Sequence, residues 1–131
     1  MEKLSREKPL NGLDVREESE QYPVEQEEMA LRDEYFQTVA FLAKSLSDEN
    51  RLRIIRCVSC GKKSVSSIVE TLGLSQPLVS HHLRELKRSL LVKIERNGPF
   101  IYYELVDPRI LDVVRMLSTV ATDLLTARKT F

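Results

Sequence analysis

Residues 64–89 read SVSSIVETLGLSQPLVSHHLRELKRS and show the pattern of two helices joined by a tight turn. The first helix repeats apolar residues at the spacing of one helical face, with Val65, Ile68, Val69 and Leu72. Ser64 is a good N-cap for it, and Gly73 supplies a left-handed stop. Ser75 is a second N-cap, and Pro77 falls in the first helical turn, where proline is tolerated. The pattern predicts a helix-turn-helix.

The second of these helices, expected over residues 76–89, has an apolar and a polar face. At about 100° per residue, the apolar face contains Leu78, Val79, His82, Leu83 and Leu86. The opposite face carries side chains that can hydrogen-bond to a phosphate or a base edge, namely Gln76, Ser80, His81, Arg84, Lys87 and Arg88. We therefore predict a recognition helix for the major groove of DNA, with His82 as a buried, hydrogen-bonded anchor and His81 facing the DNA.

Residues 92–105 follow this helix with the pattern of a β-hairpin. Apolar and polar residues alternate over 92–96, and the segment 100–105 is aromatic and β-branched. Between them, Asn97-Gly98 is a strong hairpin signal. A hairpin directly after a recognition helix is a wing, so Lys93, Arg96 and Asn97 are expected along the DNA backbone or the adjacent minor groove.

Three further helices complete the predicted fold. One is expected from about Val24 to Leu46, one begins after a capping Ser47, and the last begins near Pro108. The last helix carries a wide apolar stripe of Ile110, Val113, Val114, Leu117, Val120, Ala121, Leu124 and Leu125. A domain this small offers little other surface against which this stripe could pack. We therefore expect the first and last helices to form a homodimer interface. The fold class is mainly α with a small β-hairpin, a dimeric winged helix-turn-helix.

The net charge of zero conceals an uneven distribution along the chain. Residues 1–34 hold 11 acidic and 5 basic side chains, whereas residues 51–96 hold 10 basic and 3 acidic ones. A cationic block in a small domain favours binding to a polyanion. We expect residues 1–23 to form an acidic, mobile arm and residues 24–131 to form the DNA-binding and dimerisation domain.

Several classes of protein are not indicated by this sequence. It has no nucleophile elbow, phosphate-binding loop or zinc-protease motif, so no enzyme is predicted. No run approaches the ~18 apolar residues of a membrane span, and the first ten residues do not resemble a secretory signal. Two cysteines are too few for a secreted disulfide scaffold. We expect a cytoplasmic protein without a membrane partner.

From about Phe41 to Leu105 the sequence resembles the ArsR/SmtB family of metal-responsive winged-helix repressors. The matching segments are LSDENRLRII (46–55), LSQPLVSHHL (74–83) and YYEL (102–105). The resemblance implies a homodimeric repressor that binds an imperfect palindrome in double-stranded DNA and is released by a cytoplasmic signal. The alternative is a winged-helix module for protein contacts or constitutive DNA binding, with no effector.

The chain departs from the pattern of this family at three places. Leu90 stands where the family often has glycine, after the recognition helix. Ser64-Val65-Ser66 replaces a Cys-Val-Cys metal box and lacks the thiolates that arsenite, cadmium or lead need. No histidine follows His82, although zinc- and cobalt-type members use histidine and carboxylate ligands on the last helix. Since the ligands of both known types of metal site are missing, we assign no metal or cofactor to either of them.

Cys57 and Cys60 remain as candidates for a redox or soft-metal sensor. On a helical wheel they lie beside Arg53 and Arg56, whose charges would favour the thiolate that such a sensor requires. Two thiolates alone make a poor closed metal site. Alternatively, Cys57 only fills a position that is commonly apolar, because free cysteine behaves as a small hydrophobe. Both interpretations stay open at this point.

Overall fold

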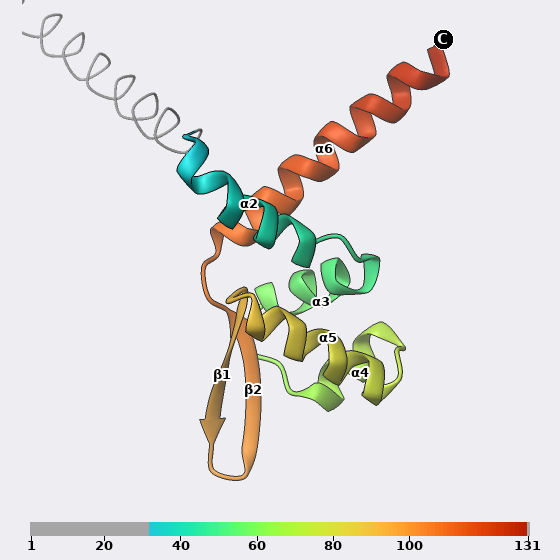
Figure 1. Cartoon of the computed structure of the whole chain (residues 1–131). Helices are drawn as coiled ribbons and strands as arrows, with labels where there is room; N and C mark the ends of the chain where they lie inside the picture. The colour runs from blue at the N-terminus through green and yellow to red at the C-terminus, as the bar shows by residue number, and fades with distance from the viewer. Residues whose placement is uncertain (1–31, 131) are drawn as a thin grey trace, which may run out of the picture. The chain divides into compact units, whose positions relative to one another are not determined.

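The computed structural model describes residues 32–130, which are divided into two units between Ala40 and Phe41. The elements are α2 (Asp33–Ser45), α3 (Glu49–Ser59), α4 (Val65–Leu72), α5 (Gln76–Arg88), β1 (Val92–Asn97), β2 (Phe100–Leu105) and α6 (Arg109–Thr130) (Figure 1). This order confirms the predicted winged helix-turn-helix. The predicted acidic arm, residues 1–23, and the expected helical residues 24–31 lie outside the described residues.

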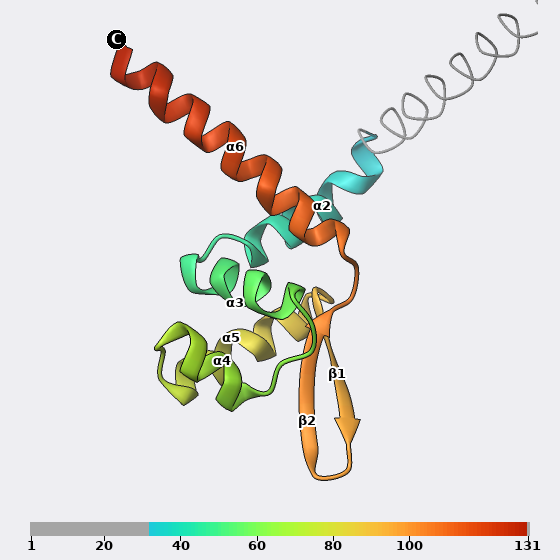
Figure 2. The same cartoon turned by 180° about the vertical axis from the view of Figure 1, so that it is seen from behind.

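The hydrophobic core of the second unit lies where α3, α4, α5 and the start of the hairpin meet (Figure 2). Its buried members are Ile54, Ile55, Val58, Ile68, Val79, Leu83, Leu86, Leu91 and Val92. These side chains occupy the apolar positions of each element, so burial of one face per helix fixes how the helices pack. The core thus holds α4 and α5 in the helix-turn-helix arrangement.

The helix ends follow local capping rules, with one correction to the sequence prediction. Ser64 and Ser75 accept hydrogen bonds from the first turns of α4 and α5, and Gly73 ends α4 in the left-handed region at φ 65°. The predicted cap of α3 was wrong. Asp48 caps α3 by accepting from two backbone N–H groups, while the Ser47 hydroxyl donates to the Lys44 carbonyl. A carboxylate next to the positive end of the helix dipole is the stronger acceptor.

The end of α5 is closed by a non-glycine residue in the left-handed region. Leu90 has φ 63° and is the one non-glycine residue with positive φ among residues 32–130. Its N–H donates to the Lys87 carbonyl, and the next N–H, of Leu91, donates to Leu86 at 2.9 Å. These two bonds form a Schellman motif, in which glycine is the usual residue at the Leu90 position. The departure noted in the sequence therefore costs backbone strain, while the hydrogen bonds of the motif are still formed.

The hairpin turns one residue later than the Asn97-Gly98 signal suggested. Asn97 pairs with Phe100, so the loop is Gly98-Pro99. Gly98 has φ 62°, the sign that a type II′ turn requires at its first central residue. The φ of proline, fixed near −65°, suits the second position.

Residues directly opposite in an antiparallel ladder share a face, which gives the hairpin two distinct faces. One face carries Val92, Ile94, Arg96, Ile101, Tyr103 and Leu105, and its inner part packs on the core. The other carries Lys93, Glu95, Asn97, Phe100, Tyr102 and Glu104. Lys63, in the link between α3 and α4, extends the sheet by a bridge to Tyr103, with N–H···O distances of 3.0 and 2.8 Å. The base of the wing is thereby tied to the helical part of the domain.

Helix α6 contacts the core only near its beginning. Ile110 and Val114 pack against the core, and the rest of the helix extends away from it (Figure 1). Val113, which lies between these two residues, and Leu117 and Leu124, further along the helix, are at least half exposed. No helix within residues 32–130 is long and apolar enough to cross a membrane.

Candidate DNA-binding interface

Helix α5 presents the polar face that the sequence predicted. Val79, His82, Leu83 and Leu86 are buried against the core, and Leu78 is half-buried. On the opposite side the structure leaves Gln76, His81, Arg84, Lys87 and Arg88 exposed, with Ser80 half-buried. The side chains of Arg84 and Lys87 form no hydrogen bond or ion pair with another described residue, whereas Arg88 pairs with Glu85 at 3.2 Å. The surface is therefore cationic and largely free of internal partners.

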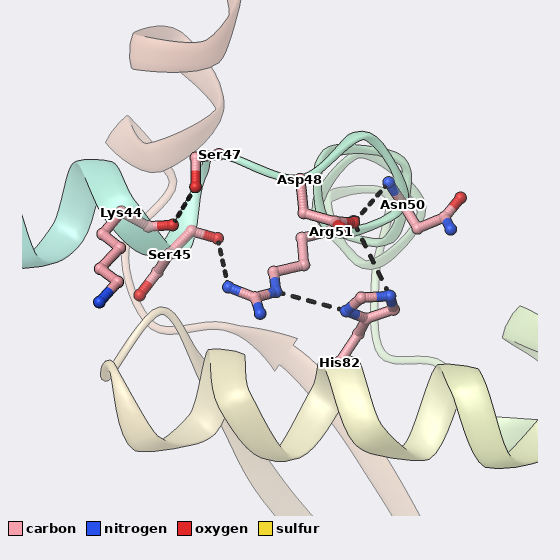
Figure 3. Close-up of polar contacts among 7 residues, drawn as sticks. All are labelled: Lys44, Ser45, Ser47, Asp48, Asn50, Arg51 and His82. Atoms are coloured by element: carbon pink, nitrogen blue, oxygen red, sulfur yellow. Dashed lines mark hydrogen bonds and ion pairs between the residues drawn. The ribbon is translucent and has the colours of Figure 1, made fainter.

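His82 anchors this helix through a polar network with α3 (Figure 3). His82 is 5% exposed, and its Nδ1 accepts a hydrogen bond from Arg51 Nε at 3.3 Å. The same guanidinium donates to the carbonyl of Ser45 at 3.4 Å. On the other side of the ring, His82 Nε2 lies 3.7 Å from Asp48 Oδ1. The prediction of a buried, hydrogen-bonded His82 is confirmed.

The protonation states in this network follow from its geometry. Burial lowers the pKa of His82 below its ordinary value of 6.5, and nearby Arg51 lowers it further, against the opposing charge of Asp48. The hydrogen bond from the Arg51 backbone N–H lowers the pKa of the Asp48 carboxyl. Since Nδ1 accepts from Arg51, the proton of the neutral ring sits on Nε2, toward the ionised Asp48.

Sequence reasoning missed Arg51, Asp48 and Ser45 as members of this network. Arg51 and His82 are 31 residues apart, so no local pattern connects them. The sequence held a signal for the cap alone, since Asp48 stands at the start of a helix, where a carboxylate is a preferred N-cap. The network joins the cap of α3 to the middle of α5 and so fixes the position of the recognition helix.

The wing does not bring its three predicted DNA contacts together. Lys93 and Asn97 lie on one face of the hairpin and Arg96 lies on the other. Lys93 is also engaged in an ion pair with Glu104 at 3.5 Å, whereas the side chain of Arg96 has no such partner within residues 32–130. Arg96 is therefore the wing cation most available to a phosphate.

The cysteine pair differs in part from the sequence expectation. Cys57 is half-buried and packs against the core, and burial raises the pKa of its thiol despite the charges of Lys63 and Arg56. The nearby positive charges act in the expected direction, but burial outweighs them, so the thiolate of Cys57 is not favoured overall. Cys60 is exposed and donates a weak hydrogen bond to the Arg56 carbonyl at 3.7 Å. The two thiols face different surroundings.

The positions that correspond to a Cys-Val-Cys box serve local structure here. Ser64 Oγ accepts from the Ser67 N–H as the cap of α4 and lies 3.2 Å from Ser66 Oγ. In the part of the chain that the structure describes, no three His, Cys, Asp or Glu side chains are grouped to hold a metal ion.

Comparison with known proteins gives one consistent result. Residues 48–93 match the family described as "Bacterial regulatory protein, arsR family". An uncharacterized HTH-type transcriptional regulator of Methanocaldococcus jannaschii is 31% identical over 85 residues, covering 64% of this chain and 96% of that protein. A probable mercury resistance operon repressor of Streptomyces lividans is 34% identical over 86 residues, covering 66% of this chain and 69% of that protein.

Solved structures agree with these sequence relatives. The transcriptional repressor BigR of Xylella fastidiosa superposes with a TM-score of 0.62 at 30% identity, covering 72% of this chain and 94% of that chain. The homodimeric winged helix-turn-helix DNA-binding domain Mb0332 of Mycobacterium bovis gives a TM-score of 0.62 at 25% identity, covering 70% and 88%. With its capped helix-turn-helix and bridged wing, this chain belongs to the arsR family of bacterial regulatory proteins and is a DNA-binding transcriptional regulator.

Proposed function

We propose that this regulator is an effector-responsive repressor that binds an imperfect palindromic operator as a homodimer. The observation that carries the proposal is the exposed face of α5, where Arg84 and Lys87 have no partner among the described residues. An unpaired cationic face on a rigidly anchored helix suits the negatively charged groove of DNA. Relatives named as repressors of mercury and arsenical resistance operons support the repressor assignment.

Each side chain on this face has a role that follows from its place along α5. Helix-turn-helix proteins insert the N-terminal part of the recognition helix into the major groove. Gln76, Ser80, His81 and Arg84 are then within reach of base edges, and an arginine can fork onto a guanine. Lys87 and Arg88 lie further back, toward the phosphates. In the wing, Arg96 contacts the backbone or the minor groove, with Lys93 and Asn97 on the opposite face of the hairpin.

The homodimer is proposed from the apolar residues that α6 leaves uncovered. Leu117 is 55% exposed and Leu124 is 65% exposed, an unusual state for so many large apolar side chains on one helix. A two-fold interface buries such a surface on both copies at once. The Mb0332 domain is named as homodimeric, which supports the same assembly here.

The candidate effector site is the pair Cys57 and Cys60, in a pocket of about 350 Å³ beside α3. Oxidants and soft metals or metalloids are the signals that two thiols can detect. The donor set fits a reversible thiol modification better than a closed metal site, since two thiols leave most coordination positions unfilled.

The DNA assignment is tested with fragments that the protein itself selects from a random pool. We expect Arg84→Ala to weaken binding by about 1–3 kcal/mol and to relax the preference at one base pair in each half-site. Arg109→Ala removes the same charge from an exposed position beyond the wing and serves as the control. Unchanged affinity of an Arg84→Ala/Lys87→Ala double variant, at equal salt, would contradict the proposal and favour a module for protein contacts.

A further inference from the structure

The pocket beside α3 combines two thiols with three positive side chains. Arg53, Arg56 and Cys57 line it from α3, and Cys60 lines it from the C-cap of that helix. Lys63 lines it from the following link, and the last turn of α4 closes it. No carboxylate lines this pocket among the residues that the structure describes. A ligand for this pocket should therefore carry negative charge and react with a thiol.

The positive charges differ in how far they are already neutralised. Arg53 Nη2 is paired with Glu49 Oε1 at 2.7 Å. The Arg56 guanidinium and the Lys63 ammonium form no ion pair or hydrogen bond with another side chain within residues 32–130. Lys63 is also half-buried, so its charge is screened less by salt than that of a fully exposed lysine. Arg56 and Lys63 are thus the cations available to an incoming anion.

The two thiols also differ, and the difference selects the one that reacts. Cys60 is exposed, whereas Cys57 is half-buried and packs on the core. Burial raises the pKa of the Cys57 thiol and so reduces its thiolate fraction. Accessibility therefore makes Cys60 the nucleophile, and the raised pKa of the Cys57 thiol disfavours reaction at the other cysteine.

We propose that Cys60 reacts selectively with disulfides of small anionic thiols and is converted to a stable mixed disulfide. The Cys60 thiol first loses its proton to solvent. Its thiolate then attacks one sulfur of the anionic disulfide, so that the S–S bond of the reagent breaks, a Cys60–S–S–R bond forms and RS⁻ leaves. A lone pair of the Cys60 thiolate forms the new S–S bond, and the electron pair of the broken S–S bond leaves with RS⁻. The Cys60 sulfur is thereby oxidised to the disulfide level and the departing sulfur is reduced to a thiolate. Arg56 and Lys63 hold the negative group of the part that stays.

The geometry of α3 explains why the mixed disulfide persists. Residues three apart on a helix have Cβ atoms about 5–6 Å apart, whereas a disulfide needs about 3.5–4.5 Å. Cys57 belongs to the last turns of α3, and Cys60 caps the helix. Attack of Cys57 on the mixed disulfide would require this end of the helix to open, which burial of the neighbouring Val58 opposes.

The pocket has a direct connection to the wing. The backbone of Lys63 forms the two-bond bridge to Tyr103 in β2, while its side chain lines the pocket. A group attached at Cys60 and held by the Lys63 ammonium therefore acts on the segment that ties the wing to the domain. This regulatory consequence rests on the proposed function, whereas the chemistry at Cys60 does not.

The test measures second-order rates of thiol reaction for the reduced full chain. The probes are dianionic 5,5′-dithiobis(2-nitrobenzoate), neutral 2-hydroxyethyl disulfide and dicationic cystamine, each normalised to its rate with N-acetylcysteine amide, a reference thiol that carries no carboxylate. We expect the normalised rate of the anion to exceed that of the cation by about tenfold at low salt and to approach it at 1 M NaCl, where the Debye length is about 3 Å. Intact mass and peptide mapping should find one adduct per protomer, on Cys60.

Matched variants separate the pocket from the general positive field. Lys63→Gln and Arg56→Gln should each reduce the preference for the anion several-fold. Lys62→Gln removes the same charge one residue away, where the lysine is paired with Glu95 at 2.7 Å, and should change it little. Equal normalised rates for the three probes, an adduct on Cys57, or an internal Cys57–Cys60 disulfide as the product would overturn the inference.

A last measurement keeps this inference apart from the proposed function. Operator affinity is compared for the reduced protein and its purified anionic mixed disulfide. Weaker operator binding by the modified protein supports both the chemistry at Cys60 and the sensory role proposed for the cysteine pair. If charge-selective modification of Cys60 is found but affinity is unchanged, the pocket chemistry stands and the sensory role proposed for the pair is contradicted.

Discussion

Replacing Leu90 by glycine should relieve strain at the end of the recognition helix. Leu90 sits at φ 63°, where an L side chain costs about 1–2 kcal/mol because its Cβ crowds the following carbonyl. Glycine removes this cost but adds about 0.5–1 kcal/mol of backbone entropy to the unfolded chain. The leucine side chain is 74% exposed, so it contributes little packing.

Comparison with alanine isolates the effect of the backbone. Leu90→Ala keeps the strained Cβ and loses the same outer atoms, so we expect Leu90→Gly to be about 0.5–1 kcal/mol more stable than Leu90→Ala. Gly73 gives the reverse experiment, since it holds φ 65° and a Cβ added there would meet no atom within 4 Å. Gly73→Ala should therefore lower stability by a similar amount through backbone strain alone.

Urea denaturation at one fixed protomer concentration measures these differences, because association makes apparent stability depend on concentration. Circular dichroism follows the helices, and the slope of each transition tests whether the folded and unfolded states stay comparable. The reasoning is refuted if Leu90→Ala is as stable as Leu90→Gly while Gly73→Ala is destabilised as expected. That result would mean that residue 90 does not occupy the left-handed region in solution.

Three other predictions follow from described contacts. Burial depresses the pKa of His82, so the unfolded chain binds the proton more tightly and the free energy of unfolding should fall as pH drops below about 6.5. Urea titrations at several pH values should show that His82→Gln lacks this dependence on pH. An identical dependence in both proteins would exclude His82 as its source. Leu117→Arg places a charge in the proposed seam and should give monomers in sedimentation, so a stable dimer would show that the interface lies elsewhere. Arg96→Ala should weaken the binding of all DNA sequences alike and reduce the slope of log affinity against log salt concentration by about 1. Lys93→Ala, which removes a partner of Glu104, should have a smaller effect. The opposite ranking in salt titrations would reverse the wing assignment.

Local signals were enough to predict most of the fold. The caps at Ser64 and Ser75 and the stop at Gly73 depend on a few neighbouring backbone groups, which the sequence itself specifies. Where two good capping residues are adjacent, as at Ser47 and Asp48, only the backbone path determines which one is used. The turn shift to Gly98-Pro99 has the same origin, since two overlapping pairs can each form a turn.

The candidate site was less accessible to such reasoning because it depends on burial and on contacts between distant segments. The polar face of α5 could be predicted from helical periodicity, and it is exposed as expected. The raised pKa of Cys57 could not be predicted from the sequence, because it comes from burial against the core, which outweighs the effect of the nearby charges. The two-residue period of a strand already separates Lys93 from Arg96, so this difference could have been predicted.

The bridge between Lys63 and Tyr103 has a consequence for observing the protein in solution. Each of the two amides donates to the carbonyl of the other residue, so neither can exchange its hydrogen with water while the strands stay joined. Their exchange rates, resolved by NMR, report how often the wing separates from the helical part of the domain. The molecule thus carries two backbone amides, at the point where the thiol pocket and the wing meet, whose hydrogen exchange measures this separation.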